Sequence, residues 1–375
     1  MKLCIVTHKV AKGDGQGRVN YEVAQAALQR GHQVTVIASQ IDQALQHQPQ
    51  LDWVPIPVKT LPTELLKNLH FANQSARWLN THRNRFDLIK VNGAITWAAG
   101  DVNVAHFVHS AWLHSPAHVW RQRKDAYGLY QWLYTALNAR WERRAFAQAR
   151  QVIAVSSQVR ADLEKLGVPP DLIQVIYNGV DTSEFYPGQS DRTALGLPDS
   201  VPLAIFAGDI RSSRKNLDSV LKALVKVSGL HLAVVGSLDG SPYPALAQAL
   251  AVRDRVHFLG FRQDIPALMR ASDFLVFPSR YETFGLVVLE AMASGIPVIT
   301  SAATPAAELL TSDAGIVISN PDDVSALEKE MQYLTDDPTQ RQQMGTQARA
   351  IAEKHSWSQM AQRYVDLFEQ LNPSC

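Results

Sequence analysis

Apolar residues along this chain fall into short runs that alternate with stretches of helical periodicity. The first case is an apolar run at 3–7, a glycine-rich loop, an amphipathic stretch at 18–30 and a second run at 33–38. This order predicts a βαβ unit, whose strands are parallel because a crossover helix joins them. Further strand-like runs follow at 53–58, 87–91, 104–108, 152–155 and 174–177. They predict one doubly wound parallel sheet.

A second alternation begins after residues 182–200, which are rich in Pro, Gly, Ser and Asp and lack periodicity. That composition is typical of a linker. Beyond it the strand-like runs lie at 203–207, 230–235, 256–259, 274–277, 297–300 and 315–318. From residue 322 onward the pattern is helical only, and it closes on an amphipathic stretch at 357–371. We expect this last helix to cross back onto the first domain.

The length of 375 residues exceeds what one hydrophobic core usually organises. We therefore predict an α/β protein of two doubly wound, Rossmann-like domains, at 1–182 and 183–355, with a crossing helix at 356–375. If the two domains face each other, a ligand cleft forms at the carboxyl ends of both sheets.

Residues 279–295, SRYETFGLVVLEAMASG, place Glu282 and Glu290 at either end of an uncharged, strongly apolar segment. Apolar residues surround any helix drawn through 284–292, which predicts a buried helix, and a buried carboxylate without a partner is costly. A helix from one glutamate to the other would advance the chain by about 12 Å. Both carboxylates could then accept hydroxyl groups from opposite ends of one ligand, such as a ribose and a hexose. The alternative is that Glu282 only stabilises a helix N-terminus and Glu290 pairs with a buried arginine.

Two loops carry features of phosphate binding. The loop at 12–18 places Gly15 and Gly17 directly before a helix, where backbone N–H groups can approach an anion. It does not fit a dinucleotide fingerprint, because Asn20 stands at the third glycine and residues 39–40 offer no acid for a ribose. The alternative is a simple turn.

The second loop follows the run at 203–207 and holds Gly208, Arg211, Arg214 and Lys215 ahead of a helix. Cations oppose the dipole at a helix N-terminus unless an anion is bound there, and a diphosphate would supply that anion. We predict that Arg211 and Lys215 contact the diphosphate and that Arg214 lies on the surface. A solvated basic loop is the alternative.

Composition excludes several classes of function. Hydrophobic content of 46%, charge of 19% and a formal net charge of +1 are ordinary for a globular protein and indicate no nucleic-acid binding. Cys4 and Cys375 form neither a metal-ligand spacing nor a disulfide framework, which favours a reducing compartment. The sequence shows no signal peptide or membrane span, so we expect a cytoplasmic protein.

One region departs from this neutral balance. Residues 112–150 interleave Arg and Lys with Trp and Tyr and contain only two acids, Asp125 and Glu142. Basic and aromatic residues on helical segments are typical of peripheral contact with an anionic membrane, here the inner face of the plasma membrane. The alternative is a helical pair that packs within the first domain and exposes a solvated basic face.

Taken together, these residues resemble the retaining nucleotide-sugar glycosyltransferases of the GT-B fold. The resemblance is to the large family 4, which includes sucrose synthase, bacterial lipopolysaccharide glucosyltransferases and phosphatidylinositol mannosyltransferases. It covers nearly the whole chain, and its most specific part is the E-x7-E pattern of Glu282 and Glu290. Residues 177–181, YNGVD, look like that family's interdomain signature.

The resemblance implies a role for each donor-binding residue. Glu290 would bind the ribose and Glu282 the hexose hydroxyls, while the backbone N–H groups of Phe284 and Gly285 would meet the sugar or phosphate. Lys215 would stabilise the leaving diphosphate, and Gly208 belongs to the same donor-binding set.

In the first domain, the acceptor domain of this family, the resemblance places His109 beside the transferred sugar. Gly15 and Gly17 would form the loop near the phosphates and the acceptor. Without the resemblance, His109 follows an apolar run at a position from which it would project into the cleft, although a lone histidine is more often an ordinary hydrogen-bonded residue. The chain departs from the family pattern twice: Asp209 stands where an arginine often follows the glycine, so Arg211 is taken as its substitute, and Asp14 replaces the first glycine of the Gly-Gly-x-Gly-Arg loop.

The reaction implied is transfer of a hexose from a UDP-, GDP- or ADP-sugar to an acceptor hydroxyl of a glycan, glycolipid or small molecule, with retention. No divalent metal or other cofactor is expected, since no D-x-D pair occurs in the sequence. Other nucleotide-sugar enzymes of the same architecture, such as an epimerase or a phosphorylase, and a non-catalytic two-lobed sugar-binding protein are the alternatives.

Overall fold

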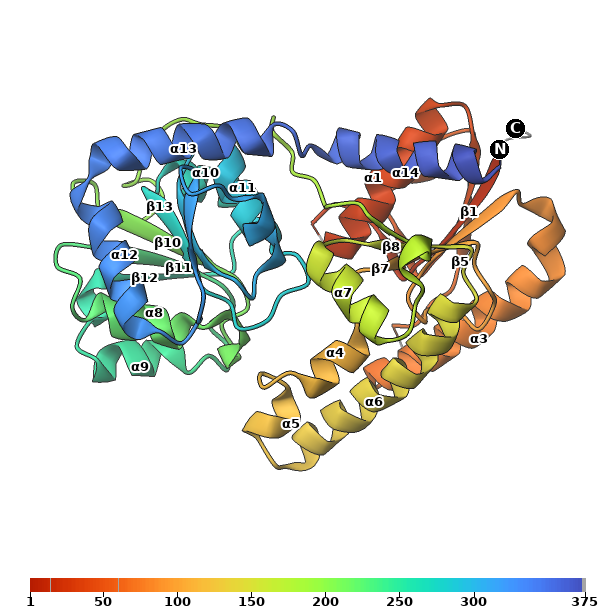
Figure 1. Ribbon diagram of the computed structural model, residues 1–375, viewed down its shortest axis with the longest axis horizontal. Helices are drawn as coiled ribbons and strands as arrows, with labels where there is room; N and C mark the ends of the chain where they lie inside the picture. Colours follow the sequence, from red (N-terminus) through yellow and green to blue (C-terminus); the bar gives the residue numbers. More distant parts are fainter. Residues whose placement is uncertain (14, 60, 373–375) are drawn as a thin grey trace. The chain divides into compact units, whose positions relative to one another are not determined.

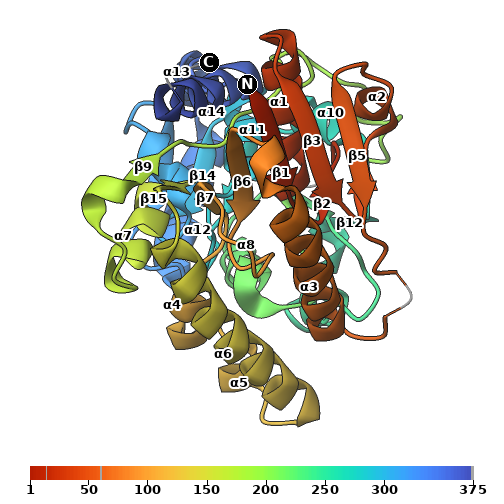
Figure 2. The same ribbon diagram turned by 90° about the vertical axis from the view of Figure 1, so that its right-hand side faces the viewer.

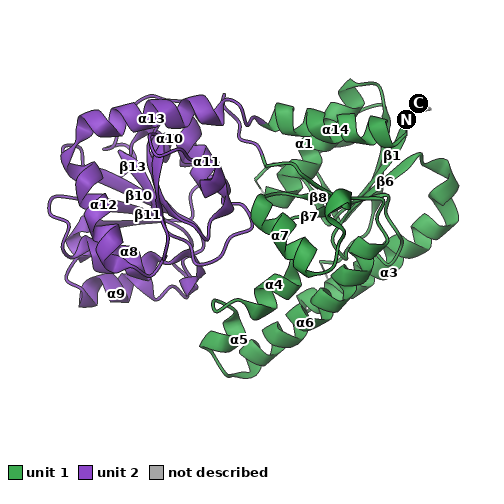
Figure 3. Cartoon of the chain, in the orientation of Figure 1, with its two compact units in different colours: residues 1–178, 357–375 green, residues 179–356 purple. Residues whose placement is uncertain are grey.

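The computed structural model describes residues 1–13, 15–59 and 61–372 (Figure 1). Asp14 and Cys375, which entered the sequence predictions, lie outside the described residues. The chain divides into two compact units (Figure 3). Unit 1 comprises Met1–Asn178 and Trp357–Cys375, and unit 2 comprises Gly179–Ser356.

Unit 1 is built on a seven-stranded parallel sheet in the order β5-β3-β1-β6-β7-β8-β9. Leu3 to Val6 in its central strand are fully buried, which explains an unbroken apolar run in place of alternation. The strands are β1 (Lys2–Val6), β3 (Gln33–Ala38), β5 (Leu51–Pro55), β6 (Leu88–Asn92), β7 (Val102–Ala105), β8 (Gln151–Ala154) and β9 (Ile173–Val175). The predicted strand at 104–108 ends earlier than expected, because the chain leaves the sheet after Ala105 and enters a helix at His109.

A small parallel pair, β2 (Lys9–Val10) and β4 (Gln40–Ile41), lies outside this sheet. The sequence does not predict it, because two residues are too few to show a periodic pattern. The helices of unit 1 are α1 (Gly15–Gln29), α2 (Gln43–Gln46), α3 (Glu64–His82), α4 (His109–His114), α5 (Val119–Gln122), α6 (Ala126–Ala147), α7 (Ser157–Lys165) and α14 (Trp357–Leu371), with 3-10 turns η1 (Arg83–Arg85) and η2 (Pro170–Leu172).

The C-terminal helix α14 packs against α1 in unit 1 (Figure 1). Arg30 anchors it with ion pairs to Asp366 at 2.6 Å and Glu369 at 2.9 Å. At the other end of the helix, the Arg18 guanidinium lies 5.7 Å from the centre of a Trp357 ring. Apolar residues of α14 such as Tyr364 and Phe368 are fully buried against the unit, so the amphipathic pattern at 357–371 has a partner.

Unit 2 has a six-stranded parallel sheet in the order β12-β11-β10-β13-β14-β15. Its strands are β10 (Leu203–Ala207), β11 (His231–Val235), β12 (Val256–Gly260), β13 (Phe274–Phe277), β14 (Val298–Ser301) and β15 (Gly315–Ile318). Its helices are α8 (Leu217–Leu224), α9 (Tyr243–Ala249), α10 (Ile265–Arg270), α11 (Leu286–Ala293), α12 (Val324–Asp336) and α13 (Pro338–Ala352), with 3-10 turns η3 (Ser213–Lys215), η4 (Arg253–Arg255) and η5 (Pro305–Leu309). Two parallel α/β units confirm the predicted fold class.

No helix among the residues described has the length and apolar character needed to span a bilayer.

Candidate functional site

The candidate donor residues of unit 2 follow strand ends at the carboxyl edge of its sheet. Gly208 comes directly after β10, and residues 278–285 lie between β13 and α11. This is the edge at which open parallel sheets bind ligands. The residues therefore stand where the fold makes a site available.

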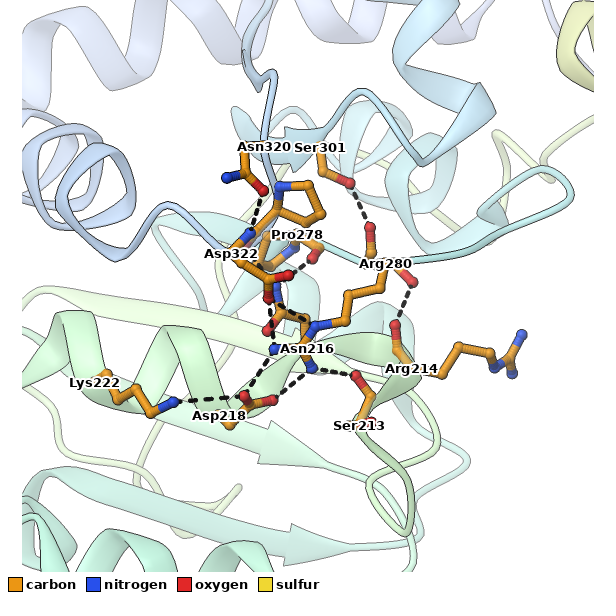
Figure 4. A network of polar contacts seen from close by, with 12 residues as sticks. Ser213, Arg214, Asn216, Asp218, Lys222, Pro278, Arg280, Ser301, Asn320 and Asp322 are labelled. Carbon is orange, nitrogen blue, oxygen red and sulfur yellow. Dashed lines mark hydrogen bonds and ion pairs between the residues drawn. The ribbon is translucent and has the colours of Figure 1, made fainter. Parts of the chain in front are cut away.

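The loop that carries Lys215 is held by Asn216. This residue is fully buried and has a left-handed backbone, with φ 66° and ψ 36°. Its side-chain nitrogen donates to the Pro278 carbonyl at 3.0 Å and to the Pro321 carbonyl at 2.5 Å. These two bonds tie the turn η3 to the chain that leaves β13 and to the chain that follows β15 (Figure 4).

Arg280 completes this scaffold (Figure 4). Its guanidinium makes a bidentate contact with Asp218, at 2.9 and 2.8 Å, and a further bond of 2.7 Å to Asp322. It also donates to the Ser213 carbonyl at 2.6 Å. Bidentate charge-assisted bonds fix direction as well as distance. The backbones that carry Lys215 and Glu282 are thus held by one common network.

Within this frame the Lys215 ammonium forms an ion pair with the Glu282 carboxylate. Their side chains are only 14% and 9% exposed. Ser279 Oγ lies 3.3 Å from the same carboxylate oxygen, and Lys215 Nζ lies 5.1 Å from the centre of the Phe277 ring. Burial lowers the pKa of Lys215, the Glu282 carboxylate opposes that shift, and the nearby Arg214 charge adds to it. A buried cation and anion are therefore held side by side.

The structure corrects the helix expected between the two glutamates. Helix α11 begins only at Leu286, and Gly285 before it has a left-handed backbone with φ 97°. Glu282 therefore lies in the preceding loop and Glu290 in the helix. The apolar residues after Gly285 are largely buried as expected, and the buried Phe284 is held through its carbonyl, which accepts from the Ala306 N–H at 2.7 Å.

Glu290 is half-buried on α11. Burial raises its pKa from the usual value of 4.5 to about 7, and the Glu184 charge adds to the shift. Among the described residues no hydrogen-bond donor contacts this carboxylate, so the alternative, a pairing of Glu290 with a buried arginine, is not found there. Its carboxylate has acceptor capacity that the chain itself leaves unused.

Gly285 is a position where only glycine fits. A Cβ placed there would lie 2.6 Å from Cγ2 of Thr304 and 4.0 Å from Cγ of Glu282. A left-handed backbone also disfavours any side chain. The glycine therefore lets the N-terminus of α11 lie directly against the Thr304 side chain.

We expect Gly285→Ala to lower the free energy of unfolding by about 2 kcal/mol or more, from backbone strain together with the clash. Chemical denaturation of the purified protein measures the loss. Gly240→Ala is the matched control, because Gly240 has φ 70° but a Cβ added to it would meet nothing within 4 Å. An equal loss in the two variants would show that the Thr304 contact adds no constraint.

The cationic loop is arranged differently from the expectation. Arg211 is exposed and pairs with Asp209 at 2.9 Å, whereas Arg214 is half-buried and its carbonyl accepts from Ser279 Oγ at 3.0 Å. Gly208 lies beneath the Lys215 stem, since a Cβ added to the glycine would lie 3.5 Å from Cγ of the lysine. The structure therefore brings Gly208, Lys215, Glu282 and Gly285 together and directs Arg211 toward Asp209.

In unit 1, the predicted residue His109 is held by a buried carboxylate. His109 begins α4, and its Nδ1 lies 3.0 Å from Glu142, whose carboxylate also accepts the backbone N–H groups of His109 and Ser110 at 2.9 Å each. Glu142 is nearly fully buried. A carboxylate at Nδ1 places the proton there and leaves the lone pair of a neutral imidazole on Nε2.

Gly15 and Gly17 lie in the first turn of α1, and Gly17 is buried. Three residues on, Asn20 explains why the third glycine of a dinucleotide fingerprint is missing. Its amide nitrogen donates to the Gln16 carbonyl at 2.8 Å, and its oxygen accepts from the fully buried Lys90 ammonium at 2.5 Å. Burial lowers the pKa of Lys90 to about 7. Asn20 thus links the start of α1 to a buried cation that sequence reasoning did not identify.

Within the described ranges, no group of three or more His, Cys, Asp or Glu side chains is placed to hold a metal ion.

Two family models match consecutive parts of the chain. The first, Glycosyltransferase Family 4, matches residues 13–184, and the second, Glycosyl transferases group 1, matches residues 189–351. The chain belongs to the family 4, group 1 glycosyltransferases. The stated resemblance is confirmed at this level.

Curated relatives of this glycosyltransferase include two enzymes named D-inositol 3-phosphate glycosyltransferase. That of Xylanimonas cellulosilytica is 32% identical over 246 residues, which cover 61% of this chain and 59% of the relative. That of Mycobacterium bovis is 36% identical over 163 residues, covering 41% and 34%. An uncharacterized glycosyltransferase of Methanocaldococcus jannaschii is 29% identical, covering 58% and 60%. The chain thus spans between about a third and three fifths of the curated relatives it matches.

Solved structures share the fold over the whole glycosyltransferase chain. WaaG, a glycosyltransferase involved in lipopolysaccharide biosynthesis, superposes with a TM-score of 0.77 at 22% identity, covering 98% of this chain and 99% of WaaG. Sucrose-phosphate synthase from Thermosynechococcus elongatus gives 0.80 at 21% identity with full coverage of both chains. Anabaena HepE in complex with UDP-glucose gives 0.73 at 22% identity, covering 99% and 100%. At these identities the likeness establishes the GT-B fold.

Proposed function

We propose that the protein transfers a hexosyl group from a nucleoside diphosphate sugar to an acceptor hydroxyl, with retention of anomeric configuration and without a metal ion. The observation that carries the proposal is the convergence of the Lys215–Glu282 pair and the α11 N-terminus at the carboxyl edge of the unit 2 sheet. Glu290, with its unused acceptor capacity, lies on the same helix. Cation, hydroxyl acceptors and helix dipole are the groups that a diphosphate, a hexose and a ribose require.

Transition-state charge explains the cationic side of the site. As the glycosidic bond breaks, the sugar becomes oxocarbenium-like and negative charge collects on the diphosphate. Lys215, the nearby Arg214 guanidinium and the backbone N–H groups at Phe284 and Gly285 would stabilise that charge. Arg211 would join them by leaving Asp209. The leaving phosphate would take the acceptor proton on the same face, so retention needs no separate general base. His109 of unit 1 would lie beside the transferred sugar.

The donor is identified by a thermal-shift screen of UDP, GDP, ADP and their sugars. A ligand at 100 times its dissociation constant should stabilise the protein by about 2.7 kcal/mol. HepE, which shares the fold, binds UDP and UDP-glucose, so UDP-glucose is the first donor to test. The products are then followed by nucleotide release with hydroxyl acceptors, including glycans and glycolipids of the cell envelope, and the anomeric configuration by NMR. Nucleotide-sugar binding without acceptor-dependent release would favour an epimerase, a phosphorylase or a non-catalytic binding protein.

We also propose that the region at 112–150, which contains α5 and α6, contacts an anionic membrane surface from the cytoplasmic side. These elements project beyond the rest of unit 1 (Figure 2). Helix α6 buries a mostly polar stripe of Gly128, Thr135, Asn138, Glu142 and Phe146. Its exposed side instead carries large apolar residues: Tyr127 and Leu129 at 52%, Leu133 at 45% and Trp132 at 41%.

Charge follows the apolar residues along the same helix. By helical periodicity Leu129, Trp132 and Leu133 share a face with Arg140, Arg143 and Arg144, which are exposed. At the tip, the exposed Lys124 and Arg123 lie over aromatic rings, at 4.2 Å from the Trp120 ring centre and 5.1 Å from that of Tyr127. Apolar side chains flanked by cations match an anionic bilayer surface.

We expect Trp132→Ser with Leu133→Ser to abolish most sedimentation with phosphatidylglycerol vesicles at low salt. The wild-type protein should bind these vesicles and not phosphatidylcholine vesicles, since each basic residue near an anionic surface contributes about 1 kcal/mol. Tyr333→Ser on α12 of unit 2 is the matched control, because Tyr333 is 43% exposed but lies outside the basic region. Failure of the wild-type protein to bind either vesicle would remove the membrane proposal and leave the transferase proposal unaffected.

A further inference from the structure

The Lys215–Glu282 ion pair joins the two residues that, under the proposed function, hold different parts of the donor. Lys215 is assigned to the diphosphate and Glu282 to the hexose hydroxyls, yet the structure binds them to each other. Both side chains are mostly buried. If the pair separates, water therefore compensates neither charge well. A donor that engages both must therefore replace one contact by two.

The surroundings allow the side chains to separate while their backbones stay in place. Asn216 and Arg280 hold the two backbone segments through bonds to Pro278, Ser213 and Asp218. Gly208 lies beside the Lys215 stem and Gly285 beside the Glu282 stem, and neither glycine places a side chain against them. Opening the pair is therefore a matter of side-chain rotation.

We propose that this pair couples recognition of the diphosphate to recognition of the sugar, so that the site favours the intact donor over the free nucleoside diphosphate. The inference rests on the proposed function. A free diphosphate that draws Lys215 away leaves the buried Glu282 carboxylate without its cation, and an unpartnered buried charge is strongly unfavourable. The hexose hydroxyls of an intact donor supply hydrogen bonds to that carboxylate and remove the penalty.

The same coupling acts after transfer. Once the sugar has left, Glu282 has lost its hydroxyl partners, and the pair with Lys215 competes with the diphosphate for the ammonium. The pair thereby favours release of the product nucleotide. Both the donor and the product nucleotide must break the Lys215–Glu282 contact, but only the donor supplies new partners to Glu282. This difference discriminates between the two ligands.

Glu282→Gln tests how the Glu282 charge affects binding of the free nucleotide and of the nucleotide sugar. The amide keeps the shape of the side chain but leaves no unpaired charge when Lys215 moves. We expect the variant to bind the free nucleoside diphosphate about tenfold tighter than wild type, while the nucleotide sugar binds no tighter. The preference for the sugar over the free nucleotide should thus fall about tenfold. Calorimetry with UDP and UDP-glucose, or with the pair that stabilises the protein in the thermal screen, measures both affinities.

Three further variants make the result specific. Glu328→Gln is the matched control, because Glu328 pairs with the exposed Lys226 at 3.2 Å and its loss should change neither affinity. Lys215→Met combined with Glu282→Gln should lose the gain in nucleotide affinity, since the freed ammonium is its source. Glu282→Ala removes the same charge and gives the same test if the glutamine variant does not fold.

An opposite result is physically reasonable and would overturn the inference. If Glu282 serves mainly to keep Lys215 protonated against burial, the glutamine variant should bind the free nucleotide more weakly. Unchanged or weaker nucleotide binding in Glu282→Gln, with wild-type transfer intact, would refute the coupling and leave the proposed function standing. Absence of any nucleotide or nucleotide-sugar binding by the wild-type protein would refute both.

Discussion

Lys215→Ala should reduce turnover about 100-fold, as loss of one donor to a developing negative charge does in other enzymes. The effect is expected in kcat more than in KM, because the charge on the diphosphate grows as the glycosidic bond breaks. The buried position of Lys215 beside the Phe277 ring strengthens its electrostatic effect relative to an exposed lysine. Initial rates of acceptor-dependent nucleotide release at saturating donor give the measurement.

Two companion variants isolate the role of the ammonium. Lys226→Ala removes a lysine that is 69% exposed in the same unit, and its turnover should stay at the wild-type level. Lys215→Ala also leaves Glu282 without its cation, so the double variant with Glu282→Gln tests whether the loss comes from that unpaired charge. Recovery of turnover in the double variant, or near-normal turnover in Lys215→Ala itself, would contradict the assignment to the leaving diphosphate.

The fold was predictable because burial on both faces of a parallel strand leaves a strong trace in the sequence. The run at 203–207 corresponds residue for residue to β10, which is buried along its whole length. The second strand of the first βαβ unit, 33–38, likewise coincides with β3. Pairs with no such trace, such as β2 and β4, escaped prediction because they depend on backbone bonds between distant loops.

The structure brings some of the predicted donor residues together, such as Lys215 and Glu282, but the geometry of this group could not be predicted from the sequence. Glu282 was expected on a helix because the residues around Phe284 are apolar, whereas the buried Phe284 lies in the loop, where its carbonyl accepts from the Ala306 N–H. The left-handed Gly285 then delays the helix until Leu286. Local periodicity cannot distinguish a buried loop from a buried helix over so few residues.

Arg280 makes a side-chain contact that the sequence does not predict. It lies two residues before Glu282, but its bidentate partner Asp218 is 62 positions away. Nothing in the spacing of the two residues indicates the pair. The same applies to Lys90 and Asn20, which are 70 positions apart and meet in the interior of unit 1. Charged residues in apolar strands, such as Lys90 in β6, are the signal that could have prompted a search for such partners.

Glu290→Gln should have two opposite effects: a more stable protein and weaker nucleotide binding. In the folded protein, burial raises the pKa of Glu290 from 4.5 to about 7. The folded state thus favours the protonated form, and the stability that protonation contributes is fully present below about pH 4.5 and lost as pH rises through about 7. The glutamine variant carries no charge at any of these pH values.

The stability gain of Glu290→Gln over wild type should therefore grow between pH 5 and pH 8 and reach about 1–3 kcal/mol at pH 8. Thermal and urea unfolding at the two pH values measure it. In the same variant, affinity for the nucleoside diphosphate should fall about 30-fold, because a charged acceptor to a ribose hydroxyl contributes about 2 kcal/mol. Glu328→Gln in the same unit is the control, because Glu328 pairs with the exposed Lys226; it should leave nucleotide affinity unchanged and give no stability gain between pH 5 and pH 8.

The combination distinguishes a ligand-binding carboxylate from a structural one. A residue retained for folding should cost stability when neutralised, whereas one held in an unfavourable environment for a ligand should stabilise the protein when neutralised. A loss of stability in Glu290→Gln at pH 8 would show that the carboxylate has a partner within the protein. Unchanged nucleotide affinity by calorimetry would show that the ribose is bound elsewhere, even if the stability prediction held.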